Sequence, residues 1–210
     1  MSCEFFQLNE LEVELVEIHE VLRCILHQIM FHRAYGPVQP KDVHMELCNI
    51  TYVQCGETEV EKKIEEKIEE FLDWLVKNPV KKSQICLSFY EVKNKKTFWF
   101  RNRTERVYFE HWYINLNLIS DSTEYRHSCE EGALEAHIAR REALEESIRN
   151  VLSQIIDFFT KEDYNIPPIP NFDDVISFPY EITIPSSSDS AFGMDIIMRM
   201  LQSGPPTMLS

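Results

Sequence analysis

The 210-residue sequence predicts an α+β fold, with about three helices packed on a mainly antiparallel sheet. Some segments alternate apolar and polar residues, as strands with one buried face do, while others repeat apolar residues every three or four positions, as helices do. The two kinds of segment are mixed without the regular strand–helix–strand order of a parallel sheet. We therefore expect one domain over residues 1–185, followed by a Ser-rich link and a short tail over 186–210.

The first third of the chain predicts a strand, a helix and a second strand region. Residues 10–15 alternate glutamates with apolar side chains, which is typical of a half-buried strand. Residues 19–33 carry one apolar stripe, and Gly36 ends this helix. Residues 43–53 predict either one bent strand or two short ones, with a change of face near Cys48.

The middle third predicts a helix followed by a hairpin. Thr58 and Glu61 have the spacing of a capping box, and a helical stripe then runs over residues 60–76. Two strands, at 85–90 and about 106–119, follow with roughly a dozen residues between them. We expect an antiparallel pair whose connecting loop projects from one end of the sheet.

The last third predicts a loop, a helix, a strand and a tail. Residues 120–132 lack periodicity and predict a surface loop, whereas 144–159 carry the stripe of a long helix. Residues 176–184 predict a last strand, and the polar residues 186–190 form a link after it. Apolar residues over 194–201 have the spacing of a short helix in the tail.

Charge and cysteine usage limit the possible partners and compartment. Acidic residues outnumber basic ones 35 to 21, and the net charge of -14 repels phosphate backbones, so nucleic acid is not an expected partner. Glutamates among the first twenty residues leave no secretory signal, and no apolar stretch reaches the length of a membrane span. The six cysteines form no C-x-x-C pair, so we expect a cytoplasmic protein in a reducing compartment.

The sequence offers no convincing catalytic or metal site. Its five glycines are too scattered for a phosphate-binding loop, and no serine lies in a G-x-S-x-G elbow, so we expect no enzyme and no cofactor. Cys24, His27 and His32 are the best metal ligands, but the two histidines lie about 140° apart around a helix. Packing explains them better, and ion pairing explains the Glu-rich stretches at 57–70 and 142–146.

The loop between the hairpin strands carries three consecutive aromatic residues, Phe98, Trp99 and Phe100, among many cations. Because consecutive side chains point in different directions, at least one ring should be exposed, as in binding hot spots. The alternatives are that the rings fold back onto the hairpin, or that they bind single-stranded nucleic acid or a membrane surface. The cations are Lys93, Lys95, Lys96, Arg101, Arg103 and Arg106, with Glu105 as the one acidic residue among them.

Five stretches of the chain resemble the plant members of the autophagy-related protein 101 family, and the similarity covers nearly the whole chain. These are ELEVE at 10–14, VLRCILH at 21–27, ITYVQCG at 50–56, SQICLSFYE at 83–91 and EITIPSSSDSAFGM at 181–194. The resemblance implies a HORMA fold and a scaffold rather than an enzyme. It also implies pairing with the HORMA domain of autophagy-related protein 13, within the Ser/Thr kinase complex that initiates autophagy at the phagophore assembly site.

The resemblance further implies that the aromatic loop is a WF finger, a protruding loop through which the family recruits downstream autophagy factors. Trp99 and Phe100 match its Trp and Phe. In animal members one residue separates the two rings, whereas here they are adjacent and follow Phe98. The expected function is thus a non-catalytic adaptor that forms a heterodimer and associates transiently with the site of autophagosome assembly.

Overall fold

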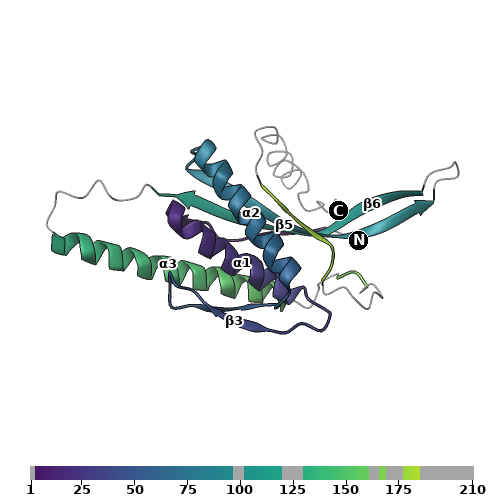
Figure 1. The fold of residues 1–210 in the computed structure, drawn as a ribbon, viewed down its shortest axis with the longest axis horizontal. Coiled ribbons are helices and arrows are strands. Elements are labelled where there is room, and N and C mark those ends of the chain that lie inside the picture. Colours follow the sequence, from purple (N-terminus) through teal and green to yellow (C-terminus); the bar gives the residue numbers. More distant parts are fainter. Residues whose placement is uncertain (1–2, 97–101, 120–129, 161–165, 169–176, 185–210) are drawn as a thin grey trace, which may run out of the picture.

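A computed structural model describes residues 3–96, 102–119, 130–160, 166–168 and 177–184 of the chain. Within these residues, one five-stranded sheet and one two-stranded hairpin are combined with three α-helices (Figure 1). The fold is α+β with a mainly antiparallel sheet, as the sequence predicts, and is consistent with a HORMA-like fold.

The five-stranded sheet has the order β1-β6-β5-β7, and β2 also pairs with β6. The β5–β6 and β5–β7 pairs are antiparallel, whereas β1 and β2 lie parallel to β6. The long strand β6 is therefore the centre of the sheet. The strands are β1 (Glu4–Gln7), β2 (Leu11–Val13), β5 (Lys82–Lys96), β6 (Asn102–Leu118) and β7 (Tyr180–Thr183).

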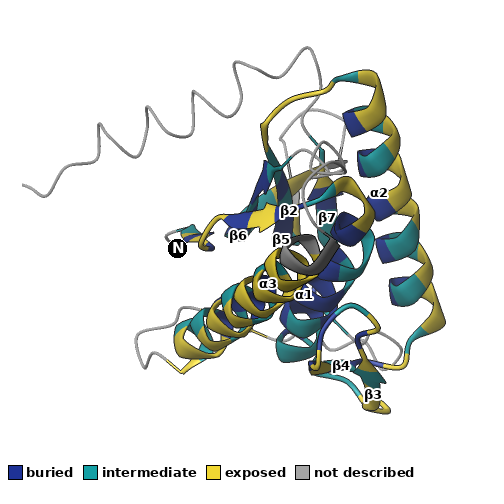
Figure 2. Cartoon of the chain, turned by 90° about the vertical axis from the view of Figure 1, so that its left-hand side faces the viewer, coloured by how far each residue is buried: buried dark blue, intermediate teal, exposed yellow. Residues whose placement is uncertain are grey.

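The helices lie on one side of this sheet, with α1 between α2 and α3 (Figures 1 and 2). Because its neighbours surround α1, nine of its 15 residues are buried, including His27 in an otherwise apolar set. The β3–β4 hairpin packs on α1 through β4. The remaining elements are η1 (Leu15–Glu17), α1 (Ile18–His32), β3 (Lys41–His44), β4 (Thr51–Gln54), α2 (Thr58–Lys77) and α3 (Glu130–Phe159).

One continuous core joins the sheet to the helices. Alternate residues of β5 and β6 point into it, and Trp112 is fully buried between Phe6 and the end of α3. Phe158 and Phe159 lie 5.8 and 5.1 Å from the Trp112 ring, centre to centre. These aromatic contacts fix the C-terminal end of α3 against the sheet.

The N-terminal predictions hold with two changes. The strand predicted over 10–15 ends at Val13, where the chain turns into η1, and the sequence did not predict β1. The region 43–53 forms two short strands, which pair antiparallel as β3 and β4.

The boundaries of later elements need correction. Thr58 is the first residue of α2 rather than its cap, because Glu57 holds the N-cap position and no side chain caps the helix. The predicted loop over 120–132 is wrong at its end, since α3 already begins at Glu130. The predicted last strand contains β7, and Ser177 forms an isolated bridge with Ala34.

The link at 186–190 and the apolar spacing at 194–201 lie outside the described residues, and the domain boundary at 185 stays a prediction. Among the described residues, no helix combines the length and the apolar character needed to cross a lipid bilayer. The described cysteines are all free thiols, and Cys129 lies outside this set.

Candidate protein-interaction site on the β5–β6 hairpin

The hairpin is longer than the sequence predicts. β5 and β6 pair antiparallel from Lys82 opposite Asn117 to Lys96 opposite Asn102, and the paired strands extend well past the helices (Figure 1). The predicted loop of about a dozen residues is therefore wrong, because most of it continues the strands. Of its cations, Lys93, Lys95, Lys96, Arg103 and Arg106 lie in β5 or β6.

The three rings that the sequence singles out, Phe98, Trp99 and Phe100, lie outside the described residues, as does Arg101. Their exposure and their role in binding stay predictions. What the structure describes is the pair of strands that leads to them.

A β-bulge marks the point where this pair leaves the body of the protein. Phe89 lies opposite Glu110 but Tyr90 lies opposite Tyr108, so β6 carries Phe109 as an extra residue. Phe89 and Phe109 are buried, whereas Val92, just beyond the bulge, is 53% exposed. We call the paired residues beyond the bulge, 90–96 and 102–108, the arm.

The base of the arm is braced by Glu181 of β7. The Tyr108 hydroxyl donates to its Oε1 at 2.6 Å, and Arg106 Nη1 lies 2.9 Å from its Oε2. Arg106 also lies over the Tyr90 ring, with Cζ 4.8 Å from the ring centre. Partial burial, and then the hydrogen bond to Glu181, raise the pKa of Tyr108, so its hydroxyl stays protonated and available as a donor.

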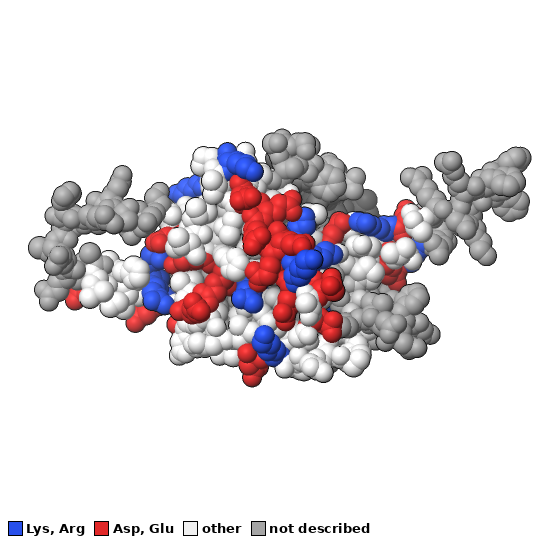
Figure 3. Space-filling view, in the orientation of Figure 1, with Lys and Arg blue, Asp and Glu red and all other residues white. Residues whose placement is uncertain are grey.

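The arm is basic, but part of its charge is compensated by residues that sequence reasoning did not pair with it. Lys93 Nζ lies 2.9 Å from a carboxylate oxygen of Glu91, and Arg106 pairs with Glu181. Figure 3 shows basic side chains where the arm begins, whereas acidic side chains form a band across the middle of the same face. The charge of the arm is thus a local exception on an acidic protein.

The sheet face opposite the helices, the outer face, carries rings that sequence reasoning missed. Ring centres lie 5.4 Å apart between Tyr90 and Tyr108, 5.3 Å between Tyr108 and His111, and 5.2 Å between His111 and Phe5. Tyr113 lies 6.3 Å from His111 on the same face. We call these five residues the aromatic strip. The strip could have been predicted from the alternation of buried and outward-facing positions along β5 and β6, because several of the outward-facing positions are tyrosine or histidine.

Burial favours the neutral forms of His111 in the strip and of the neighbouring Cys86. Burial lowers the pKa of His111, whose Nδ1 lies 2.7 Å from the Ser88 hydroxyl. Burial also raises the pKa of the neighbouring Cys86 thiol to about 11. The Ser88–His111–Cys86 group therefore offers a protonated thiol rather than a reactive thiolate.

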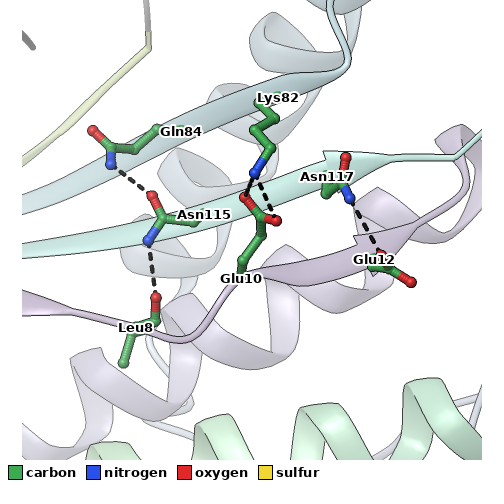
Figure 4. A network of polar contacts seen from close by, with 7 residues as sticks. All are labelled: Leu8, Glu10, Glu12, Lys82, Gln84, Asn115 and Asn117. Carbon is green, nitrogen blue, oxygen red and sulfur yellow. Dashed lines mark hydrogen bonds and ion pairs between the residues drawn. The ribbon is translucent and has the colours of Figure 1, made fainter.

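The other end of the outer face is polar (Figure 4). Gln84 donates to the Asn115 side chain at 2.6 Å, and Asn115 donates to the Leu8 carbonyl at 2.9 Å. Lys82 contacts both carboxylate oxygens of Glu10, at 2.8 and 3.0 Å. These bonds fix the β1–β2 connection to the central strands and separate a polar half of the face from the aromatic half.

The candidate metal ligands lie in packed surroundings. Cys24 and His27 are fully buried, and burial lowers the pKa of His27 to about 4. His32 stacks on Phe159, with 4.6 Å between ring centres. Among the described residues, no three His, Cys, Asp or Glu side chains are grouped to hold a metal ion.

The Glu-rich helices behave as the sequence predicts, with ion pairs along their exposed faces. On α2, Lys62 pairs with Glu66 and Lys67 with Glu70. On α3, Arg149 lies 2.7 Å from Glu145, and this hydrogen bond lowers the pKa of the Glu145 carboxyl. Intrahelical pairing therefore explains these carboxylates.

The described residues define an α+β domain from which a braced, cationic, two-stranded arm projects, and such an element is suited to contact other proteins. Comparison with known proteins gives the family. The family model for Autophagy-related protein 101 matches residues 10–173. The chain is 57% identical to Autophagy-related protein 101 of Arabidopsis thaliana over the full length of both chains.

More distant relatives are also similar to the chain. Autophagy-related protein 101 of Schizosaccharomyces pombe is 22% identical, with 86% of each chain covered. That of Xenopus laevis is 25% identical over 83% of this chain and 80% of its own. The chain therefore belongs to the autophagy-related protein 101 family, and its resemblance to the plant members is confirmed.

Proposed function

We propose that this autophagy protein is a non-catalytic adaptor of the kinase complex that initiates autophagy. In this role it pairs with the HORMA domain of autophagy-related protein 13 and recruits downstream factors through Trp99 and Phe100. Family membership supports the biological process. It acts in the cytoplasm and associates transiently with the phagophore assembly site.

The observation that carries the recruiting role is the projection of the arm beyond the helices (Figure 1). Strand pairing continues to Lys96 opposite Asn102, so the five residues 97–101 connect the ends of two paired strands. Glu181 braces the base of these strands through Tyr108 and Arg106. Because the arm is already held in place, a partner that binds residues 97–101 pays a smaller entropic cost for ordering the strands that carry them.

The direct test is the double substitution Trp99→Ala with Phe100→Ala in the full chain. Loss of a ring that anchors a partner costs on the order of 2 kcal/mol or more, about a thirtyfold weaker affinity. We expect recruitment of autophagy factors in plant cells to be lost. Affinity for the HORMA domain of autophagy-related protein 13, measured by calorimetry, and the melting temperature should both stay nearly unchanged.

Two further variants complete this test. Phe98→Ala alone shows whether the third ring takes part, and Val76→Ala on α2, where the side chain is 68% exposed, is a control for loss of an exposed apolar group. A double variant that also loses the HORMA pairing and melts several degrees lower would show that the rings belong to the core, and would contradict the proposal.

The cationic arm also supports a second candidate, a peripheral binder of membranes or single-stranded nucleic acid. Basic and aromatic residues together suit both ligands. Vesicles with 30% phosphatidylserine and a 20-nucleotide single-stranded DNA are suitable probes. Binding that falls steeply between about 50 and 200 mM salt, with no affinity for the HORMA partner, would favour this candidate over the adaptor.

A further inference from the structure

The centre of the outer face is buried, although the described helices all lie on the other side of the sheet (Figure 2). Tyr113 of β6 is 7% exposed and Ser88 of β5 is 3% exposed. Strand alternation places both side chains on the outer face, because their neighbours Trp112 and Leu87 are fully buried on the helix side. Burial of a tyrosine to this extent indicates a cover over the face, in addition to its neighbours in the strands.

The Tyr113 hydroxyl is a second sign of such a cover. It lies beside the Cys86 thiol, a weak hydrogen-bonding group, and makes no hydrogen bond of normal geometry with the described residues. Buried hydroxyls are normally hydrogen-bonded, so we expect a partner from a segment that lies over the face. Burial also raises the pKa of Cys86 to about 11, which indicates that little water reaches this point.

We propose that residues 185–210, which lie outside the described residues, fold over the outer face and cover Cys86, Ser88 and Tyr113. The apolar side chains of 191–201 make the contact with the face. This inference concerns the chain alone and does not depend on the proposed function. A face covered in this way leaves the arm and the helix side of the protein as the surfaces open to partners.

The position of β7 gives these residues access to the face. β7 is the edge strand next to β5, and its last residue, Thr183, pairs with Cys86. The six residues 185–190 span at most about 20 Å when extended. The far strand β1 lies three strand spacings from β7, about 14 Å. Residues from 191 onward can therefore reach every strand of the face.

The composition of residues 191–201 suits the face. Their sequence is AFGMDIIMRML, in which Asp195 and Arg199 are the two charged residues. In a helix these two lie about 40° apart, so apolar side chains occupy most of the circumference and need a cover from water. The helix predicted over 194–201 would be about 12 Å long, close to the 14 Å between β7 and β1. Segment and face thus match in length and in apolar character.

Attachment to β7 favours this segment over any other occupant. A short flexible link holds a tethered segment at an effective concentration in the millimolar range. A second copy of the chain, or another protein, would have to displace the segment from a site to which it is already joined.

The first test is photo-cross-linking in the full chain. The probe p-benzoylphenylalanine is placed at Leu201, and the irradiated protein is digested with trypsin. We expect the peptide 200–210 to be joined to 83–93, which contains Cys86 and Ser88, or to 107–126, which contains Tyr113. The same probe at Glu69, exposed on α2, is the control and should give neither product. Cross-links from position 201 to other peptides alone would overturn the inference.

Isotope labelling separates contact within one chain from contact between chains. The Leu201 probe protein is prepared both unlabelled and labelled with ¹⁵N, and the two are mixed before irradiation. Cross-linked pairs should be wholly light or wholly heavy. Pairs of one light and one heavy peptide would show that a second copy lies on the face, and would overturn the inference.

The second test releases the segment by substitution. Ile197→Asp with Leu201→Asp should speed the reaction of Cys86 with iodoacetamide at pH 8.5 at least about tenfold, because removal of the cover favours the reactive thiolate. Thr207→Asp with Ser210→Asp adds the same charge and is the matched control, with an unchanged rate. Equal rates in all three proteins would overturn the inference.

Cys24 provides an internal reference for this measurement, because it is fully buried in α1 on the helix side. Its reaction rate should be the same in the Ile197→Asp, Leu201→Asp variant as in the wild type. Equal acceleration at Cys24 and Cys86 would show that residues 185–210 stabilise the whole fold rather than cover this face, and would also overturn the inference.

Discussion

Arg33 and Glu110 form an ion pair that is closed to solvent. Arg33 Nε lies 2.6 Å from Glu110 Oε2, and the two side chains are 4% and 0% exposed. The Trp112 indole donates to the other carboxylate oxygen, and the Arg33 guanidinium lies over the Phe159 ring at 4.2 Å. This pair therefore joins the end of α1, the middle of β6 and the end of α3.

Breaking this pair on one side should destabilise the protein strongly. Glu110→Ala leaves a buried guanidinium without its carboxylate, and such changes cost about 3–5 kcal/mol. Urea unfolding followed by circular dichroism measures the loss. Arg33→Met with Glu110→Leu removes both charges and should lose less than Glu110→Ala alone. A double variant that is at least as unstable as Glu110→Ala would contradict the argument.

The free energy of unfolding should decrease as the pH falls below about 6.5, because of His27. The unfolded chain takes up a proton on this residue below about pH 6.5, whereas burial lowers the pKa in the folded protein to about 4. The contribution to stability is complete above pH 6.5 and is lost as the pH falls toward 4, by at most about 3 kcal/mol.

The measurement for His27 is urea unfolding at several pH values between 7 and 4.5. His32 and His111 shift in the same direction, so the comparison is with His27→Leu, which removes one titration only. The difference in the free energy of unfolding between the two proteins should change with pH. Parallel curves would show that His27 has the same pKa in the folded and the unfolded chain, and would contradict the prediction.

Gly56 should not tolerate a side chain. Its φ is +71°, and a Cβ here would collide with the carbonyl oxygen of Gln39. Gly56→Ala should therefore destabilise the protein by about 1–3 kcal/mol, through backbone strain and displacement of the loop that holds Gln39. Differential scanning calorimetry tests this, with Thr58→Ala, two residues later and exposed, as the control. A Gly56→Ala protein that melts with the wild type would contradict the prediction.

Arg140 holds α3 to the η1 turn. Its Nη1 lies 2.8 Å from Glu17 Oε1 and 3.2 Å from Glu14, and Glu17 is almost fully buried. Arg140→Ala should cost about 2–3 kcal/mol, and Arg140→Lys should recover only part, because an ammonium group cannot make the two-pronged contact. Lys62→Ala, which removes an exposed pair with Glu66, should change stability by less than about 0.5 kcal/mol. Similar losses in Arg140→Ala and Lys62→Ala would mean that the contact has no structural role.

Elements with one buried face were predictable from the sequence. The stripe of α2 and the alternation of β5 near Leu87 reflect burial on one side, which is the property that sequence periodicity reports. The same reasoning failed where an element carries exposed apolar residues. Val92 on the arm and Leu134 near the start of α3 are both exposed, so no buried apolar stripe marks these segments.

The candidate site was only partly predictable. The composition of the loop indicated Trp99 and its cations, but Glu181, which braces the arm, is 75 residues away from Arg106 in the chain. The aromatic strip likewise combines Phe5 with His111, whose contact depends on the register of β1 against β6. Long-range pairing of this kind leaves no local signal in the sequence.

The parallel pairing of β1 and β2 with β6 has a consequence for synthesis of the protein. Glu4 lies opposite Glu110, so the first strands emerge from the ribosome about a hundred residues before their only neighbour in the described sheet. At about 5–20 residues per second, Phe6 waits several seconds or more without its Trp112 contact. The apolar residues of β1 and β2 therefore stay exposed, and available to chaperones, until β6 has been synthesised.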